Sequence, residues 1–228
     1  MSEVVMLQQS VMAADEKHAL SIKENLKRKE ILFVNMIGSP GCGKTTLLEE
    51  TAKHGEFRMA VIEGDLETSR DAERLAALGV NSYQINTHGG CHLEAHVIER
   101  VIEEIPLDDV DVLFVENVGN LVCPAEFDLG EDFKVAVLST PEGADKPLKY
   151  PMLFANSHAI ALTKTDLLPH VKFDMQMFKK DISSINPVAL VFEIDLINGD
   201  GISGWLEFIS QKIEEKKKRG EILRRIEP

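Results

Sequence analysis

Several features are scarce in this chain, and each scarcity excludes a class of protein. Its 228 residues include three cysteines, an odd number, and no export signal precedes them, so a disulfide framework is not expected. The cysteines would therefore act as thiols or thiolates. No apolar stretch approaches the roughly 20 residues of a membrane span, and no basic start is followed by an apolar block. We therefore predict a cytoplasmic protein that does not enter a membrane.

Basic charge is also scarce. The chain has 25 Lys and Arg against 38 Asp and Glu, a formal net charge of −13. This balance argues against a protein that binds nucleic acid or anionic membranes without specificity. The length lies within the range of one α/β domain and is ample for a core.

Short apolar runs alternate with segments of helical spacing. Six runs are predicted as strands, at 31–36, 59–63, 112–115, 135–138, 159–162 and 188–194. Helical spacing occurs at 45–53, 68–78, 92–104 and 173–184, and a last helix begins near residue 202. Runs that are apolar throughout suit strands covered on both faces. The sequence thus predicts an α/β fold with a doubly wound, mainly parallel sheet and helices on both faces.

We expect three parts along the chain. Residues 1–30 form an amphipathic helical extension, for which packing against the domain is expected, and residues 31–215 form the nucleotide-binding domain. Residues 216–228 form a charged tail, predicted as a solvated helix end rather than a binding patch.

A phosphate-binding loop follows the first predicted strand and leads into the first helix of the domain. Its backbone N–H groups can surround phosphate oxygens, Lys44 can reach the outer phosphates, and the Thr45 hydroxyl can bind Mg²⁺. The strand before it and the helix after it are the context that the motif needs, so we predict a P-loop NTPase. Cys42 is expected to be a small filler within the loop. The nucleotide-binding residues expected here are Gly38, Ser39, Pro40, Gly41, Cys42, Gly43, Lys44, Thr45 and Thr46.

Two carboxylates follow predicted strands, where ligands of doubly wound sheets bind. Asp65 comes after the second strand and Glu116 after the third. One could hold Mg²⁺ together with Thr45 while the other orients the attacking water, and the sequence leaves open which does which. Gly119 could place its N–H against a γ-phosphate, so that residues 116–119 sense the nucleotide. The candidate catalytic residues are Lys44, Asp65, Glu116 and Gly119.

A third motif, Thr163-Lys164-Thr165-Asp166, indicates the base. The Asp166 carboxylate can accept from both N1–H and the N2 amine of guanine, while the Lys164 stem covers the ring. Adenine cannot offer this pair of donors, so the motif favours GTP. Thr163 departs from the commoner Asn of the guanine motif.

The remaining distinctive residues are Cys91, His92 and Cys123. Thiolate and imidazole together suit Zn²⁺ and also Ni²⁺, although three ligands are one short of a closed zinc site. Two additions could complete it: His96, expected on the same helix face as His92, or residues from a second chain.

Taken together, these motifs resemble the nickel-insertion GTPases of hydrogenase and urease maturation. In order and content they look like the HypB family, within the SIMIBI class of GTPases, from about residue 30 to residue 204. The segments that carry the resemblance are 38–46, 63–68, 91–96, 116–124 and 163–166.

The resemblance implies a slow GTPase whose GTP-bound form is a homodimer. Residues matching Cys91, His92 and Cys123 would carry Ni²⁺ or Zn²⁺ between the subunits. A HypA-like nickel chaperone and the large-subunit precursor of nickel-iron hydrogenase would be the partners.

Other functions stay open at this point. A related metallochaperone GTPase for urease or a cobalamin enzyme would share most motifs. A P-loop kinase would share the nucleotide site but would need an acceptor pocket and usually an Arg-rich lid. A zinc-binding scaffold would use the cysteines structurally and unfold when its metal is removed.

Overall fold

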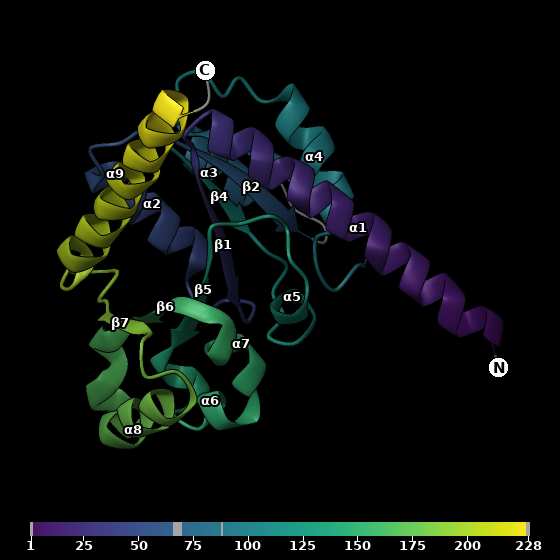
Figure 1. Ribbon diagram of the computed structural model, residues 1–228. Helices are drawn as coiled ribbons and strands as arrows, with labels where there is room; N and C mark the ends of the chain where they lie inside the picture. The colour runs from purple at the N-terminus through teal and green to yellow at the C-terminus, as the bar shows by residue number, and fades with distance from the viewer. Residues whose placement is uncertain (1, 66–69, 88, 227–228) are drawn as a thin grey trace.

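One parallel sheet organises the part of the chain that the structure describes. The computed structural model describes the backbone of residues 2–65, 70–87 and 89–226, and the side chains of 15–64, 73–87 and 89–222. The strand order is β3-β2-β4-β1-β5-β6-β7 and all described pairings are parallel (Figure 1). The strands are β1 (Leu32–Gly38), β2 (Met59–Asp65), β3 (Asn81–Asn86), β4 (Val112–Glu116), β5 (Phe133–Ser139), β6 (Ser157–Thr163) and β7 (Leu190–Glu193).

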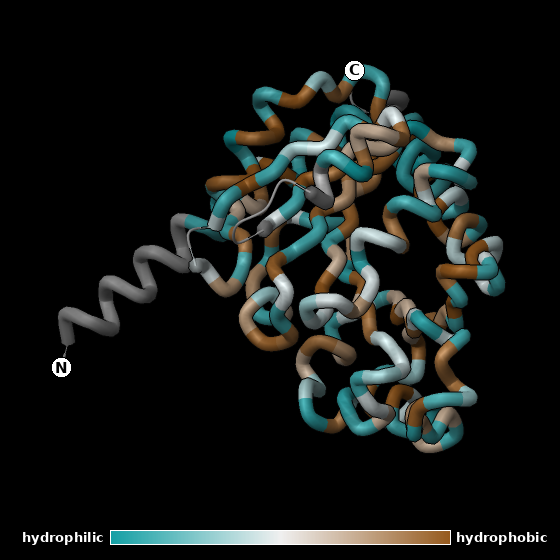
Figure 2. The backbone as a smooth tube through the Cα atoms, turned by 180° about the vertical axis from the view of Figure 1, so that it is seen from behind, coloured by the Kyte–Doolittle hydropathy of each residue, from teal (hydrophilic) through white to brown (hydrophobic). Residues whose placement is uncertain are grey.

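Helices connect the strands and cover both faces. Among them are α1 (Ser2–Arg28), α2 (Lys44–His54), α3 (Arg70–Ala76), α4 (Ala95–Glu104), α8 (Met175–Ile185) and α9 (Ile202–Ile226). Short helices are α5 (Cys123–Glu126), α6 (Lys146–Lys149) and α7 (Pro151–Asn156), with 3₁₀ turns η1 (Thr140–Glu142) and η2 (Thr165–His170). In Figure 2, brown and teal residues alternate along the helical turns that are drawn in colour, as expected where one side of a helix packs on a sheet.

The core divides along the pleat of the strands. In β1, Val34 and Met36 face a cluster that also contains Leu47 of α2 and Trp205 of α9. Phe33, on the opposite face, packs in a cluster built from α1 and α4. Residues of α5, α7 and α8 form a third cluster farther along that second face. The predicted doubly wound sheet with helices on both faces is thus confirmed, and the strands are apolar because both sides are buried.

The connectivity places a crevice at the carboxyl ends of the central strands. β1 lies between β4 and β5, and the chain leaves β1 toward β2 on one side while β5 and β6 continue on the other. The loop after β1 therefore lies at the switch point of the sheet, where ligands of doubly wound folds bind.

The structure adds one strand to the predicted elements and changes two expected boundaries. β3 was not predicted, because this edge strand has the half-exposed sequence Asn-Ser-Tyr-Gln-Ile-Asn instead of an apolar run. The predicted helix at 92–104 begins at Ala95. Helix α9 runs unbroken through residue 215, and its Lys216 and Lys217 pair with Asp132 and Asp111 at 2.6 Å. Residues 216–226 are therefore a continuation of that helix, and two of their lysines hold it on the domain.

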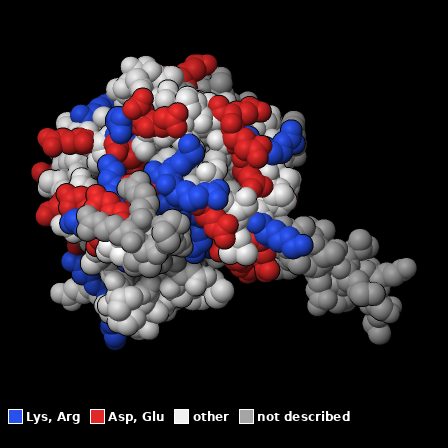
Figure 3. Space-filling model, turned by 45° about the horizontal axis from the view of Figure 1, so that its top comes forward, with Lys and Arg blue, Asp and Glu red and all other residues white. Residues whose placement is uncertain are grey.

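The charged surface is mixed on the face seen in Figure 3. Basic side chains in its middle are bordered by acidic ones. Exposed ion pairs occur among the described residues, such as Arg58 with Asp109 at 2.6 Å. Within the described residues, no helix is long and apolar enough to cross a bilayer.

Candidate nucleotide and metal sites

The phosphate loop has the backbone that its sequence predicts. β1 ends at Gly38, α2 begins at Lys44, and Gly41 and Gly43 between them have φ of 72° and 99°. L-residues with side chains rarely adopt these angles, so glycine is required at both positions. A Cβ at Gly38 would lie 2.4 Å from the carbonyl oxygen of Val137. The loop therefore packs directly against β5.

Polar side chains converge at the base of this loop. The Lys44 ammonium, 6% exposed, donates to the carbonyls of Gly38 and Ser39 at 3.4 Å and lies 3.8 Å from Glu116 Oε1. The Thr45 hydroxyl donates to the same carboxylate oxygen at 3.0 Å. Glu116 reaches the loop because β4 is paired with β1. The structure thus brings Lys44, Thr45 and Glu116 together, as expected from their positions after neighbouring strands.

Two further predicted residues near the nucleotide site are Asp65, at the end of β2, and Cys42, in the phosphate loop. Asp65 ends β2, one strand farther out, and its side chain lies outside the described residues. Cys42 is buried, and this burial raises the pKa of its thiol to about 11. The thiol is therefore protonated at neutral pH, which agrees with a packing role.

A cavity of about 360 Å³ lies beside the loop. Gly119 lies at its wall, and a Cβ there would be 2.6 Å from Pro40 Cγ, so this glycine allows residues 116–119 to approach the loop. The cavity is lined by Pro40, Gly41, Gly43, Lys44, Thr45, Thr46, Glu63, Gly64, Arg74, Glu116, Asn117, Val118, Gly119 and Lys164. Volume and polar lining suit the phosphates of a nucleotide.

The expected base motif joins the phosphate loop. Thr163 is buried, and its hydroxyl donates to the carbonyl of Cys42 at 2.5 Å. Lys164 has φ of 55°, and its ammonium donates to the carbonyl of Gly41 at 2.7 Å. Asp166 follows in η2 with a half-buried side chain. Threonine in place of the commoner Asn at position 163 thus still makes a hydrogen bond to the phosphate loop.

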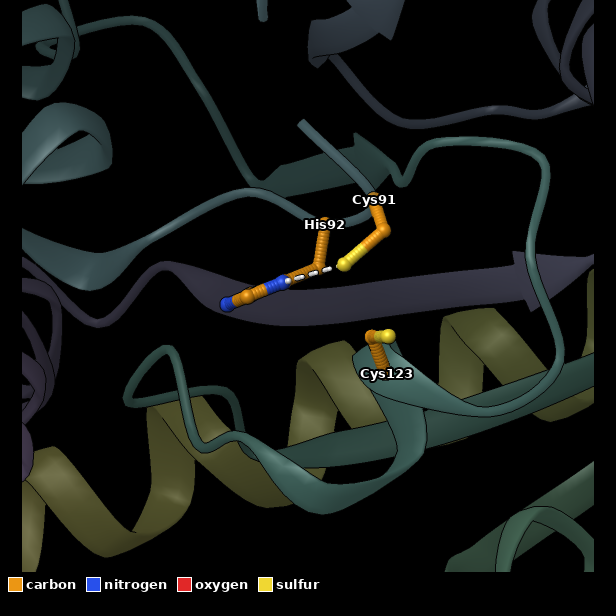
Figure 4. Close-up of side chains that lie close together, drawn as sticks. All are labelled: Cys91, His92 and Cys123. Atoms are coloured by element: carbon orange, nitrogen blue, oxygen red, sulfur yellow. Dashed lines mark hydrogen bonds between the residues drawn. The ribbon is translucent and has the colours of Figure 1, made fainter. Parts of the chain in front are cut away.

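The proposed metal ligands meet across the sequence. One donor atom from each of Cys91, His92 and Cys123 lies within 4.8 Å of the others (Figure 4). Cys91 Sγ is 3.4 Å from His92 Nδ1, and the pKa of Cys91 is raised, chiefly by its hydrogen bond with Cys123. The His92 ring stacks on Phe127 with centroids 4.0 Å apart. Two sulfurs and an imidazole form an open three-donor set of the kind that Zn²⁺ or Ni²⁺ accepts.

The expectation that His92 and His96 share a helix face is wrong. His92 lies in a loop before α4, which begins at Ala95, and the backbone N–H of the next residue, Leu93, donates to Asn117 Oδ1 at 3.2 Å. His96 instead clusters with Asp15 and Glu94.

Asn117 lies in the predicted sensor segment 116–119, but the sequence indicated no separate role for its side chain. It is 2% exposed, and its Oδ1 accepts from the backbone N–H groups of Leu93 and Val118 at 3.2 and 3.0 Å. Its Nδ2 donates to Asn35 of β1 at 3.2 Å. Asn117 directly follows the candidate catalytic residue Glu116, and this position could have indicated its role from the sequence. Arg74 and Glu63 also line the cavity. Glu63 belongs to the motif at 63–68 but was given no role, and no motif indicated Arg74.

The fold and the site define a phosphate-loop nucleotide-binding protein with an adjoining thiolate and imidazole cluster. The family model described as CobW/HypB/UreG, nucleotide-binding domain, matches residues 32–193, and the chain belongs to this family.

The similar proteins reported below belong to the HypB branch of this family. The hydrogenase maturation factor HypB of Escherichia coli (strain K12) is 44% identical over 92% of this chain and 73% of its own. That of Azotobacter chroococcum mcd 1 is 43% identical over 92% and 70%. The crystal structure of HypB from Helicobacter pylori in complex with nickel has a TM-score of 0.84 at 37% identity, covering 89% of this chain and 96% of that one. The chain is thus a homologue of HypB hydrogenase maturation factors.

Proposed function

We propose that this chain is a nickel-binding GTPase of hydrogenase maturation, whose nucleotide state controls a metal held by Cys91, His92 and Cys123. The observation that carries this proposal is the segment 116–123. Its first four residues line the nucleotide cavity, and its last is a cysteine of the metal cluster. Family membership and the nickel complex of the H. pylori relative support it.

The nucleotide half rests on the converging polar groups. Lys44 would neutralise the outer phosphates, and the Thr45 hydroxyl with the Glu116 carboxylate, or with Asp65, would hold Mg²⁺, which prefers oxygen ligands. The carboxylate that does not bind the ion would orient the attacking water. The N–H of Gly119 would contact the γ-phosphate and be released on hydrolysis. Release of phosphate in the absence of any acceptor would distinguish this GTPase from a P-loop kinase.

Two hydrogen bonds connect the halves. The Asn117 side chain accepts from the backbone of Leu93, next to His92, and the Asn120 side chain donates to the carbonyl of Cys91 at 3.1 Å. Movement of residues 116–120 with the nucleotide would therefore shift the Cys91 and His92 backbone relative to Cys123. Bound metal must change nucleotide affinity by the same factor that nucleotide changes metal affinity. A GTP-dependent homodimer, a HypA-like chaperone and the hydrogenase large-subunit precursor are the partners that we propose.

The first test is nickel and zinc binding by equilibrium dialysis, in GDP and in a non-hydrolysable GTP analogue, with the mass in solution measured alongside. We expect affinities that differ between the two nucleotides by roughly 5- to 150-fold, the usual range of coupling between sites, and a dimer with the analogue. Asn117→Ala should bring the ratio of the two affinities toward one while each site still binds, because the contact to Leu93 is lost.

Asn81→Ala, an exposed Asn at the start of the edge strand, is the matched control. Equal metal affinity in both nucleotides in the unmodified protein would refute the gating. If a folded Asn117→Ala variant keeps the same ratio of metal affinities in the two nucleotides, Asn117 takes no part in the gating.

The base preference has its own test. Asp166→Asn should weaken GTP binding and let xanthosine triphosphate compete, because an amide cannot accept twice from guanine but can donate to the xanthine O2. We expect a change of about tenfold or more in the GTP to XTP affinity ratio, for one charge-assisted hydrogen bond. Asp174→Asn, at the cap of α8, is the control. An unchanged base preference would contradict the role given to Asp166.

A further inference from the structure

Helix α1 crosses the start of α4 (Figure 1). Two imidazoles and two carboxylates gather there. His96 Nδ1 lies 3.1 Å from Glu94 Oε2 and 3.6 Å from Asp15 Oδ1. The His18 and His96 rings are 6.1 Å apart by their centroids. We call Asp15, His18, Glu94 and His96 the α1–α4 cluster.

We propose that the α1–α4 cluster is a second divalent-metal site, built from nitrogen and oxygen donors and separate from the thiolate cluster. It would take a borderline cation such as Zn²⁺, Co²⁺ or Ni²⁺. This inference goes beyond the proposed function, since it needs neither nucleotide nor the cysteines.

The donor spacing fits such an ion. Metal–ligand bonds of 2.0–2.2 Å place neighbouring donors about 3.0 Å apart in an octahedron and about 3.4 Å apart in a tetrahedron. The distances from His96 Nδ1 to the two carboxylates, 3.1 and 3.6 Å, are close to these values. One donor atom each of Asp15, Glu94 and His96 lies within 4.8 Å of the others. Small side-chain movements would therefore complete the coordination.

A carboxylate behind the cluster orients the second imidazole. His18 Nδ1 is hydrogen-bonded to Glu99 Oε2 at 2.5 Å. A hydrogen bond at Nδ1 leaves Nε2 as the nitrogen of His18 that could bind a metal. A carboxylate paired with a histidine is the usual outer shell of metal-binding imidazoles.

The backbone beneath the cluster is held by packing. Ala19, Ile22 and Leu26 of α1 lie in one buried cluster with Ala95, Ile98 and Ile102 of α4. The Asp15 carboxylate also accepts from the backbone N–H of His96 at 3.1 Å. The donors thus come from two helices with a fixed relation, as a metal site requires. His96 and Glu94 side chains are 46% and 49% exposed, so an ion can reach them.

The test is dialysis of the full chain with Zn²⁺ alone and with Co²⁺ alone in the Cys91→Ser/Cys123→Ser background. We expect about one ion per chain to remain. The Co²⁺ spectrum should show weak bands without thiolate charge transfer, as nitrogen and oxygen donors give. Adding His96→Gln or His18→Gln should lower the affinity at least tenfold, and Glu99→Gln by about 10- to 100-fold. His54→Gln, an exposed histidine of α2, should change nothing.

Two results would overturn the site: no ion bound in the double-cysteine background, or an affinity that is the same with His96→Gln. The second would leave Asp15 as no more than a cap on α4. If His96→Gln melts early, Glu94→Gln is the variant to use, since the Glu94 side chain is 49% exposed. Neither negative result affects the thiolate charge-transfer band of the unmodified chain, which reports the thiolate cluster. Failure of this site is therefore distinguishable from failure of the proposed function.

Discussion

Lys44→Ala is expected to lower the rate of GTP hydrolysis by about 10²- to 10³-fold. This is the usual effect of losing one hydrogen-bond donor that an enzyme holds ready for the charge that develops in the transition state. The Lys44 ammonium is buried and held by the carbonyls of Gly38 and Ser39 beside the cavity. It is therefore in place before phosphate binds and needs little rearrangement. Phosphate release at saturating GTP, together with nucleotide affinity, measures the loss.

Lys53→Ala provides the control for this variant. Lys53 lies on the same helix, 43% exposed and paired with Glu50, and its loss should leave hydrolysis unchanged. Thermal melting of Lys44→Ala shows whether the loop still folds. Hydrolysis at the unmodified rate in a folded Lys44→Ala protein would mean that the phosphates bind elsewhere.

Cys91→Ser and Cys123→Ser are each expected to weaken nickel binding at the thiolate cluster by at least about a hundredfold. Losing a direct ligand should cost no less than the 10- to 100-fold of outer-shell changes, and a hydroxyl is a poor substitute for a thiolate toward Ni²⁺. The thiolate-to-nickel absorption band is the measurement, because it reports these sulfurs alone.

Cys42→Ala is the matched control for the cysteine variants. This third thiol is buried in the phosphate loop with a pKa of about 11, so its removal should leave the nickel band intact. A band that survives Cys91→Ser and disappears in Cys42→Ala would reverse the assignment.

The zinc-scaffold alternative makes the opposite prediction about stability. A structural zinc site contributes its binding free energy to folding, so a chelator would unfold the protein. Three buried clusters flank the sheet and consist of packed side chains without the thiolate cluster. We therefore expect a chelated protein to keep its circular dichroism and its melting temperature within a few degrees.

Local pattern was enough to predict the central strands and the phosphate loop. Strands such as β1 and β4 are apolar on both faces, so the run itself marks them. The glycine pattern of the loop is required by its φ angles and by its packing against β5. β3 and the short helices α5 to α7 were not predicted, because they are partly exposed or too short to show a periodic pattern.

The sequence by itself determined the fold class and the phosphate loop, because apolar runs, helical spacing and the glycine motif are local patterns. The residue types of the thiolate cluster were also identified from the sequence, through donor chemistry and the family resemblance. Only the tertiary structure decided which distant residues meet. The Asn117 side chain accepts a hydrogen bond from Leu93, and Lys216 and Lys217 of α9 form ion pairs with the domain. His96 contacts Asp15 of α1 instead of His92. These contacts depend on strand order and on helix packing, which bring together segments far apart in the chain, and no local pattern encodes such distances.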